Sequence, residues 1–320
     1  MSEIFAIVLY YCEKYKHLKY LNYEIFKMIT ALIIGMISYI LLLIILFFLY
    51  RPIRVFDILQ RSILSVAGFR YKYLDTKHEK VGYFEGGKGQ SVIMIHGFMV
   101  HAGNWSTIAP KLKRNNKVII PDLPGHGKSP WPVSNRVKDL GESITELLYN
   151  KTSEQPAVLI GNSMGGAIAL RFALSYPERV KKLVLINTAG LVWHLDKDLL
   201  LPKNRTNALR KIQALLNKNI TLPAFILDDI VRQTTFQFEN LLREAMIHED
   251  YVLNEKLKDL AVKTYVLWGE KDELFSKSYL NSLLGKLPNY ELKSFPNDAH
   301  VPHNSNPKAT LTYLDEILNS

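Results

Sequence analysis

The chain has 320 residues, of which 48% are hydrophobic and 22% charged. This composition excludes a disordered chain and a polytopic membrane protein, and the length suggests about two domains, or one large α/β domain with additions. The 40 basic and 30 acidic residues give a formal charge of +10, without a long basic run, so we expect no nucleic-acid partner. Cys12 is the only cysteine, which excludes an intrachain disulfide and a multi-cysteine metal site.

The first element in the chain is an uncharged run over residues 28–50. About 20 apolar residues are enough to cross a bilayer, and this run has no polar face of the kind a buried core helix carries. A cleavable signal peptide would have a shorter apolar region and small residues at its exit, whereas this run ends in FFLY. We therefore expect a retained single-pass transmembrane anchor at 28–50, after an N-terminal segment at 1–27. The flanking charges favour neither orientation across the membrane.

Residues 51–70 are expected to connect the anchor to the rest of the chain. Arginines alternate here with apolar positions at helical spacing, which indicates an amphipathic helix. Such a helix fits two environments, the surface of the membrane or the surface of a catalytic domain, and the pattern does not choose between them.

After residue 70 the sequence alternates between strand and helix patterns. Continuous apolar runs such as 92–95 and 183–186 are typical of parallel strands covered on both faces. The alternation predicts a mostly parallel, doubly wound α/β sheet, formed by residues 71–190 and 263–320. Residues 191–262 interrupt it with helical patterns and are predicted to form an inserted helical cap. The expected strands are 80–84, 91–95, 117–121, 157–161, 182–186, 264–268 and 290–295, and the clearest helices are 137–149 and 164–176.

A candidate nucleophile, Ser163, lies in the sequence GNSMG at 161–165, directly between a predicted strand and a predicted helix. A sharp strand-to-helix turn of this kind lifts the serine hydroxyl above the sheet. The glycines two positions before and after the serine allow strand and helix to pass closely. The N-terminus of the helix then supplies amide donors beside the hydroxyl.

A nucleophilic serine needs a base and an orienting acid, and this type of fold places them in the order serine, acid, histidine. Asp272 follows the strand expected at 264–268, and His300 follows the strand at 290–295. We expect His300 to accept the proton of Ser163 and Asp272 to orient the imidazole. The neighbours that compete for these roles are Asp298 and His303, together with Glu270 and Glu273.

The oxyanion of an acyl-transfer intermediate needs two amide donors. We expect one from Met164, the residue after the nucleophile, and one from Phe98 in the loop HGFM that follows the strand at 91–95. His96 in that loop is expected to tie it by hydrogen bonds. Asp122 and His126, in the turn-rich segment 121–129, are two isolated ligands, too few for a metal site, and we expect neither a metal nor an organic cofactor.

These motifs together resemble the α/β-hydrolase superfamily, over roughly residues 70–320. Within it, the membrane-anchored monoacylglycerol lipases and related bacterial lipases look most similar. The residues that carry the resemblance are HGF at 96–98, Trp105, DLPGHGKS at 122–129, GNSMGG at 161–166, GEKD at 269–272 and His300.

The resemblance implies a serine hydrolase acting on lipid esters, with Ser163, Asp272 and His300 as the triad and the amides of Phe98 and Met164 as oxyanion donors. The cap is long enough to wall an acyl pocket, and apolar residues at 225–227 and 236–238 are candidates for lining it. Hydrolases of meta-cleavage C–C bonds share the serine turn, and a small-ester esterase is a further alternative. A binding protein without catalysis is disfavoured by the complete order of the triad.

Overall fold

A computed structural model describes residues 2–320 except 132–136, 193–195, 235–237 and 240–251. The chain divides into two compact units, Met1–Pro52 and Ile53–Ser320.

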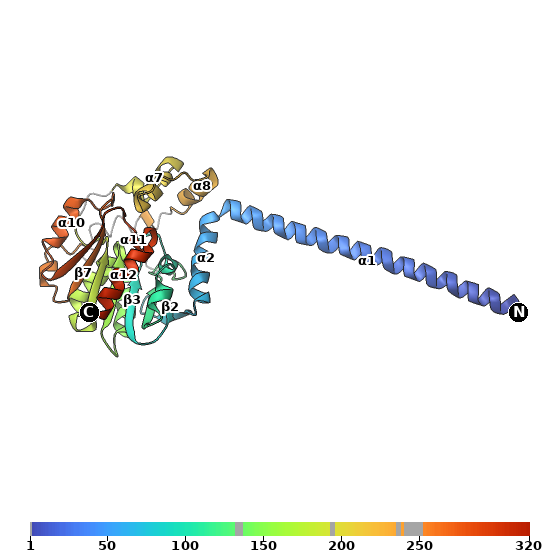
Figure 1. Ribbon diagram of the computed structural model, residues 1–320, viewed down its shortest axis with the longest axis horizontal. Coiled ribbons are helices and arrows are strands. Elements are labelled where there is room, and N and C mark those ends of the chain that lie inside the picture. The colour runs from blue at the N-terminus through green and yellow to red at the C-terminus, as the bar shows by residue number, and fades with distance from the viewer. Residues whose placement is uncertain (1, 132–136, 193–195, 235–237, 240–251) are drawn as a thin grey trace. The chain divides into compact units, whose positions relative to one another are not determined.

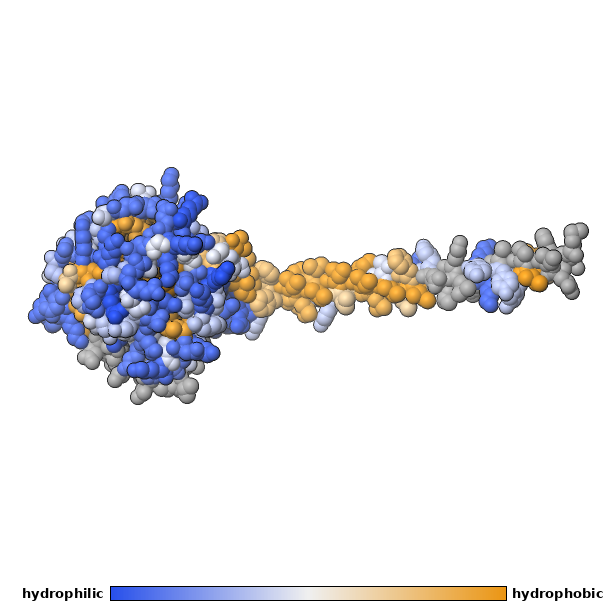
Figure 2. Space-filling view, turned by 90° about the horizontal axis from the view of Figure 1, so that it is seen from below, coloured by the Kyte–Doolittle hydropathy of each residue, from blue (hydrophilic) through white to orange (hydrophobic). Residues whose placement is uncertain are grey.

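The first unit is a single helix, α1 (Ser2–Tyr50). Its segment Ile25–Tyr50 has 26 residues and a mean hydropathy of 3.0, and within the described residues it is the helix long and apolar enough to cross a membrane. At 1.5 Å per residue it is about 39 Å long. Its apolar side chains are exposed along the whole segment, which is mostly orange in Figure 2. The more polar residues expected to form a separate N-terminal segment continue the same helix.

The second unit is built on an eight-stranded sheet in the order β1-β2-β4-β3-β5-β6-β7-β8. Strand β2 runs antiparallel to both of its neighbours, β1 and β4, and the other neighbouring strands, from β4 to β8 in this order, pair in parallel. The α/β-hydrolase fold predicted from the sequence is confirmed. The strands are β1 (Arg70–Asp75), β2 (Lys80–Gly86), β3 (Gln90–Ile95), β4 (Asn116–Pro121), β5 (Ala157–Asn162), β6 (Val180–Ile186), β7 (Thr264–Gly269) and β8 (Tyr290–Phe295).

Helices cover both faces of the sheet (Figure 1). Alternate residues of the central strands point to opposite faces, so each strand contributes to two separate apolar cores. One core packs under α4 (Val137–Lys151), α5 (Met164–Ser175) and α10 (Lys277–Leu284). The other packs under α2 (Pro52–Val66), α3 (Ala109–Leu112) and α12 (Pro307–Asn319). The short helices are η1 (Ala102–Trp105), η2 (Pro177–Arg179), η3 (Leu257–Asp259) and α11 (Pro302–Ser305).

In the described part of the segment expected to form the cap, β6 is followed by the helices α6 (Lys197–Leu200), α7 (Arg205–Leu216) and α8 (Ala224–Arg232). Helices α7 and α8 lie together beside the first turn of α2 (Figure 1). Ile53 of α2 packs with their apolar residues, and its amide donates to the buried Asp229 of α8 at 3.0 Å. The cap helices are therefore tied to the helix that begins the second unit.

The sequence prediction missed strand β1 and assigned no strand to residues 70–75. This edge strand, RYKYLD, has no completely buried residue and lacks the apolar alternation of a half-buried strand. The other seven strands match the expected ones to within two residues at either end.

Candidate active site

Ser163 occupies a strained turn between β5 and α5. Its φ of 54° and ψ of −122° lie in a region that L-residues rarely adopt, at a cost of about 1–3 kcal/mol. The turn is held from both sides, because the Ser163 amide donates to the Ile186 carbonyl at 3.1 Å and its own carbonyl accepts from the Ala189 amide at 3.0 Å. The backbone of β6 and of the segment after it thus stabilises the conformation that lifts this side chain above the sheet.

Two glycines permit the close approach of strand and helix at this turn. A Cβ on Gly161 would lie 2.5 Å from the carbonyl oxygen of Gly165, and a Cβ on Gly165 would lie 2.3 Å from the carbonyl oxygen of Ile95. Both distances are far below van der Waals contact, and both neighbours are backbone atoms that cannot rotate away. The first turn of α5 therefore passes directly against the ends of β5 and β3.

Asp272 and His300 lie in hydrogen-bond contact although they follow different strands. His300 Nδ1 is 2.8 Å from Asp272 Oδ2, and both side chains are almost completely buried. The other carboxylate oxygen, Oδ1, accepts from the amides of Leu274 at 2.8 Å and Phe275 at 3.1 Å. Because Asp272 accepts a hydrogen bond from Nδ1–H, that proton stays on Nδ1 and the imidazole keeps its Nε2 lone pair available to act as a base.

Sequence reasoning missed Asn187, which also contacts Asp272. Its Nδ2 donates to Asp272 Oδ2 at 2.8 Å, and its Oδ1 accepts from the Gly269 amide at 2.9 Å. Asn187 follows β6 with a φ of 40°, a left-handed conformation that asparagine tolerates better than most residues. A polar residue with turn propensity just after a buried strand was the available signal.

A second asparagine links the histidine to the serine turn. Asn162 Nδ2 donates to the His300 carbonyl at 3.2 Å and to the Ile186 carbonyl at 2.9 Å. Since Asn162 directly precedes Ser163, this side chain fixes the backbone of His300 against the residue next to the candidate nucleophile.

The loop after β3 lies against the serine turn. A Cβ on Gly97 would come within 3.1 Å of Ser163 Cβ, so the backbone at this position faces the serine directly. His96 Nδ1 contacts the Gly97 carbonyl at 2.8 Å and Nε2 accepts from the Leu123 amide at 3.0 Å. Burial lowers the pKa of His96 to about 3, so it is neutral and ties the loop. In the part of the chain that the structure describes, the backbone amides of Phe98 and Met164 donate no hydrogen bond. Both amides are therefore available to an oxyanion, as the prediction requires.

A family model for the alpha/beta hydrolase fold matches residues 90–254 of this chain. That match covers the serine turn and the loop after β3. The chain belongs to the α/β hydrolase fold family.

Relatives of this α/β hydrolase include enzymes of two kinds. A 2-hydroxy-6-oxononadienedioate/2-hydroxy-6-oxononatrienedioate hydrolase of Comamonas testosteroni is 30% identical over 68% of this chain and 83% of its own length. Monoacylglycerol lipase ABHD6 of Homo sapiens is 24% identical over 79% of this chain and 83% of its own length. The structure of a membrane phospholipase A, a bacterial virulence factor, has a TM-score of 0.73 at 23% identity and covers 89% of this chain and 97% of that chain.

The residues considered as alternatives to Asp272 and His300 have other partners or are exposed. The His303 ring packs against Trp105 with ring centroids 4.4 Å apart and planes inclined by 31°, and its Nε2 contacts Asn104 Nδ2 at 3.0 Å. Burial lowers the pKa of His303 to about 3. Asp298 accepts from Ser305 Oγ at 2.6 Å and from Asn306 Nδ2 at 3.0 Å. The two glutamates at 270 and 273 are exposed.

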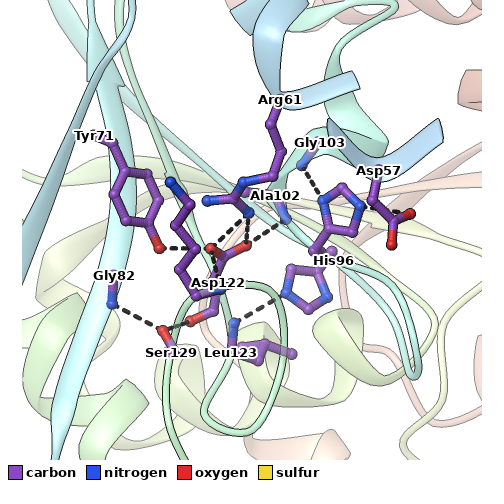
Figure 3. Close-up of polar contacts among 12 residues, drawn as sticks. Asp57, Arg61, Tyr71, Gly82, His96, Ala102, Gly103, Asp122, Leu123 and Ser129 are labelled. Atoms are coloured by element: carbon purple, nitrogen blue, oxygen red, sulfur yellow. Dashed lines mark hydrogen bonds and ion pairs between the residues drawn. The ribbon is translucent and has the colours of Figure 1, made fainter. Parts of the chain in front are cut away.

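Asp122 is a completely buried carboxylate that organises the loops beside the site (Figure 3). Its oxygens accept from Arg61 Nη1 at 2.8 Å, Tyr71 Oη at 2.6 Å and the Ala102 amide at 2.8 Å. Burial by itself would raise the pKa of Asp122, but the charge of Arg61 and these hydrogen bonds outweigh it and hold the pKa below its usual value. Among the described residues, no group of three His, Cys, Asp or Glu side chains is placed to hold a metal ion.

Residues of the cap segment reach the loop after β3. The Phe98 ring meets Phe238 edge to face with centroids 5.5 Å apart. Lys211 of α7 donates from Nζ to the Leu200 carbonyl at 2.7 Å and lies 3.8 Å from Met99 Sδ. Of the residues expected to line an acyl pocket, Leu227 is buried in the cap and Phe225 is partly exposed, whereas residue 236 lies outside the described residues.

Proposed function

We propose that the chain is a membrane-anchored serine hydrolase that cleaves carboxylic esters of lipids, with monoacylglycerols as its substrate class. The observation that carries the proposal is the 2.8 Å contact between His300 Nδ1 and Asp272 Oδ2, beside a serine held in a strained turn. The apolar segment Ile25–Tyr50 is the proposed anchor. It would concentrate the enzyme at the surface where lipid esters dissolve.

The mechanism follows from the roles of three side chains. His300 Nε2 takes the proton of Ser163 Oγ as the oxygen attacks the ester carbonyl, and Asp272 stabilises the imidazolium. The carbonyl oxygen becomes an oxyanion that accepts from the amides of Phe98 and Met164. Collapse of this intermediate breaks the ester bond, and the departing alcohol takes its proton from His300. Water, deprotonated by His300, then attacks the acyl-enzyme, releases the fatty acid and restores Ser163.

A second candidate is hydrolysis of a C–C bond in a meta-cleavage product. It is favoured by the 30% identity to the Comamonas testosteroni hydrolase, which exceeds the 24% identity to the human monoacylglycerol lipase. The lipase relative covers more of this chain, 79% against 68%.

The two candidates are separated by turnover of monoacylglycerols of several acyl lengths, a short-chain ester and a 2-hydroxy-6-oxo-dienoate. The full-length protein is assayed in detergent, with Ser163→Ala as the control. The proposal predicts that the wild-type protein has its highest kcat/KM on long-chain monoacylglycerols. It predicts that the Ser163→Ala variant turns over none of these substrates. Preferential turnover of the dienoate would overturn the ester proposal, and a strict preference for the short-chain ester would overturn the lipid substrate class.

A further inference from the structure

Helix α2 directs two of its three charged residues inward, to the catalytic domain. His101 Nε2 lies 3.0 Å from Asp57 Oδ1, and Arg61 Nη1 lies 2.8 Å from the buried Asp122 (Figure 3). Leu64 of the same helix is completely buried in the apolar core on one face of the sheet. The inner side of α2 is therefore fixed by polar side-chain contacts, one of them the Arg61–Asp122 ion pair, as well as by apolar packing.

Another side of the same helix is apolar and uncovered. Its residues Phe56, Leu59, Ile63 and Val66 follow one another at intervals of three, four and three, so they form one stripe along the helix. Their exposed fractions are 55%, 55%, 50% and 90%. We call these four residues the outer stripe.

This distribution is the reverse of that on a helix at a water-facing surface, where charged residues point outward and apolar ones inward. A helix with apolar residues on its outer side matches an apolar environment. The stripe runs through most of α2, whose 15 residues span about 22 Å.

The chain itself indicates which apolar environment this is. A single residue, Arg51, separates the end of the apolar segment at Tyr50 from the first residue of α2. Wherever the apolar segment leaves a bilayer, α2 must begin within one residue of that point. The side chains of Arg54 and Arg70, near the two ends of α2, are exposed and suit anionic phosphate groups.

We propose that the outer stripe of α2 is a lipid-binding surface that lies at the boundary between phospholipid headgroups and acyl chains. This rests on the proposed anchoring of the chain by Ile25–Tyr50. Because Ile53 donates its amide to Asp229 of the cap, the same contact holds the cap helices next to the lipid surface. The sequence pattern of residues 51–70 fits both the surface of a membrane and the surface of a catalytic domain. In this proposal one side of α2 contacts the membrane and the other side contacts the catalytic domain.

The experiment uses the full chain in proteoliposomes of phosphatidylcholine and phosphatidylglycerol. Cys12→Ser removes the only cysteine. Single cysteines are then introduced as Leu59→Cys, Ile63→Cys or Ser65→Cys, each carrying the environment-sensitive fluorophore NBD. Ser65 is the matched control, because it is exposed on α2 but lies about 140° around the helix from the middle of the stripe. Lipids brominated near the top of the acyl chains serve as the quencher.

The proposal predicts blue-shifted emission and at least threefold stronger bromine quenching at positions 59 and 63 than at 65. Equal, water-like emission at all three positions would overturn it. A blue shift at 59 and 63 without bromine quenching, lost on dilution of the protein in lipid, would assign the stripe to a second copy of the chain and also overturn it. Failure of the anchor is detected separately, as protein that does not float with the liposomes or is extracted by alkaline carbonate.

Discussion

Asp272 and His300 are separated by 28 residues in sequence and joined by a 2.8 Å contact between Oδ2 and Nδ1. The same Oδ2 accepts from Asn187, and Oδ1 accepts from two backbone amides, so four hydrogen bonds fix this carboxylate. A carboxylate held in this way presents a constant position to the imidazole, which is the condition for orienting a catalytic base.

Asp272→Asn is expected to lower kcat on a soluble ester by about 10³ to 10⁴-fold, because the amide no longer selects the tautomer with a free Nε2. The loss should appear in kcat with little change in KM. Glu273→Gln is the matched control, since Glu273 is adjacent but exposed, and its activity should stay within about twofold of wild type. Equal losses in the two variants would contradict the assignment of the acid.

Asn187→Ala is expected to reduce kcat/KM by about 10-fold to 100-fold. The variant removes one donor from Asp272 and one acceptor from the Gly269 amide, and a buried polar group left unsatisfied costs about 1–3 kcal/mol. Steady-state kinetics measures the loss of activity, and a thermal melt measures the loss of stability, so the two together separate a catalytic effect from a structural one. A lower melting temperature with unchanged kcat/KM would show that Asn187 supports the fold without positioning the acid.

Arg61→Met is expected to destabilise the second unit by about 3–5 kcal/mol, because it leaves the carboxylate of Asp122 buried without its cation. The measurement is chemical unfolding of the full chain in detergent. The control is Arg205→Met, which breaks an exposed pair with Asp228 of similar length and should leave stability nearly unchanged. Similar results for both variants would mean that the Arg61 pair contributes little.

Acid should destabilise the folded chain well above the pH at which its carboxylates titrate. Burial lowers the pKa values of His96 and His303 to about 3 and that of His126 to about 4, against about 6.5 in the unfolded chain. Between these values the unfolded state binds more protons, so stability is complete above pH 6.5 and is lost as the pH falls. Each histidine contributes up to about 1.4 kcal/mol per pH unit.

The pH effect is measured as the free energy of unfolding between pH 7 and 5. His303→Phe keeps an aromatic ring against Trp105. This variant should show a smaller change in the free energy of unfolding per pH unit, because one of the three histidines with a lowered pKa no longer contributes. A variant with the wild-type slope would indicate that the pKa of His303 is not lowered in the folded state.

The sequence predicts those site residues that directly follow a recognisable strand. Ser163 is recognisable because the two close backbone approaches at Gly161 and Gly165 force glycine at a fixed spacing around it. Asp272 and His300 are recognisable because parallel strands end at one edge of the sheet, which brings residues after β7 and β8 together.

Other features depend on contacts that no local pattern encodes. Asn187 acquires its role through a bond to Asp272, 85 residues away, and Arg61 through an ion pair with Asp122, 61 residues away. Helical periodicity shows that α2 is amphipathic but does not show that two of its three charged side chains, Asp57 and Arg61, point inward. Edge strand β1 was missed because it is held by pairing with β2 rather than by a buried apolar face.

The most direct test of the account is covalent labelling of the full-length protein with a fluorophosphonate, followed by mass spectrometry of the modified peptide. The account predicts one adduct, on Ser163, at a rate that falls by about 10³-fold or more in His300→Ala because the base is lost. Ser163→Ala, with an unchanged melting temperature, should show no adduct. An unlabelled wild-type protein, or equal labelling of Ser163→Ala, would contradict the account.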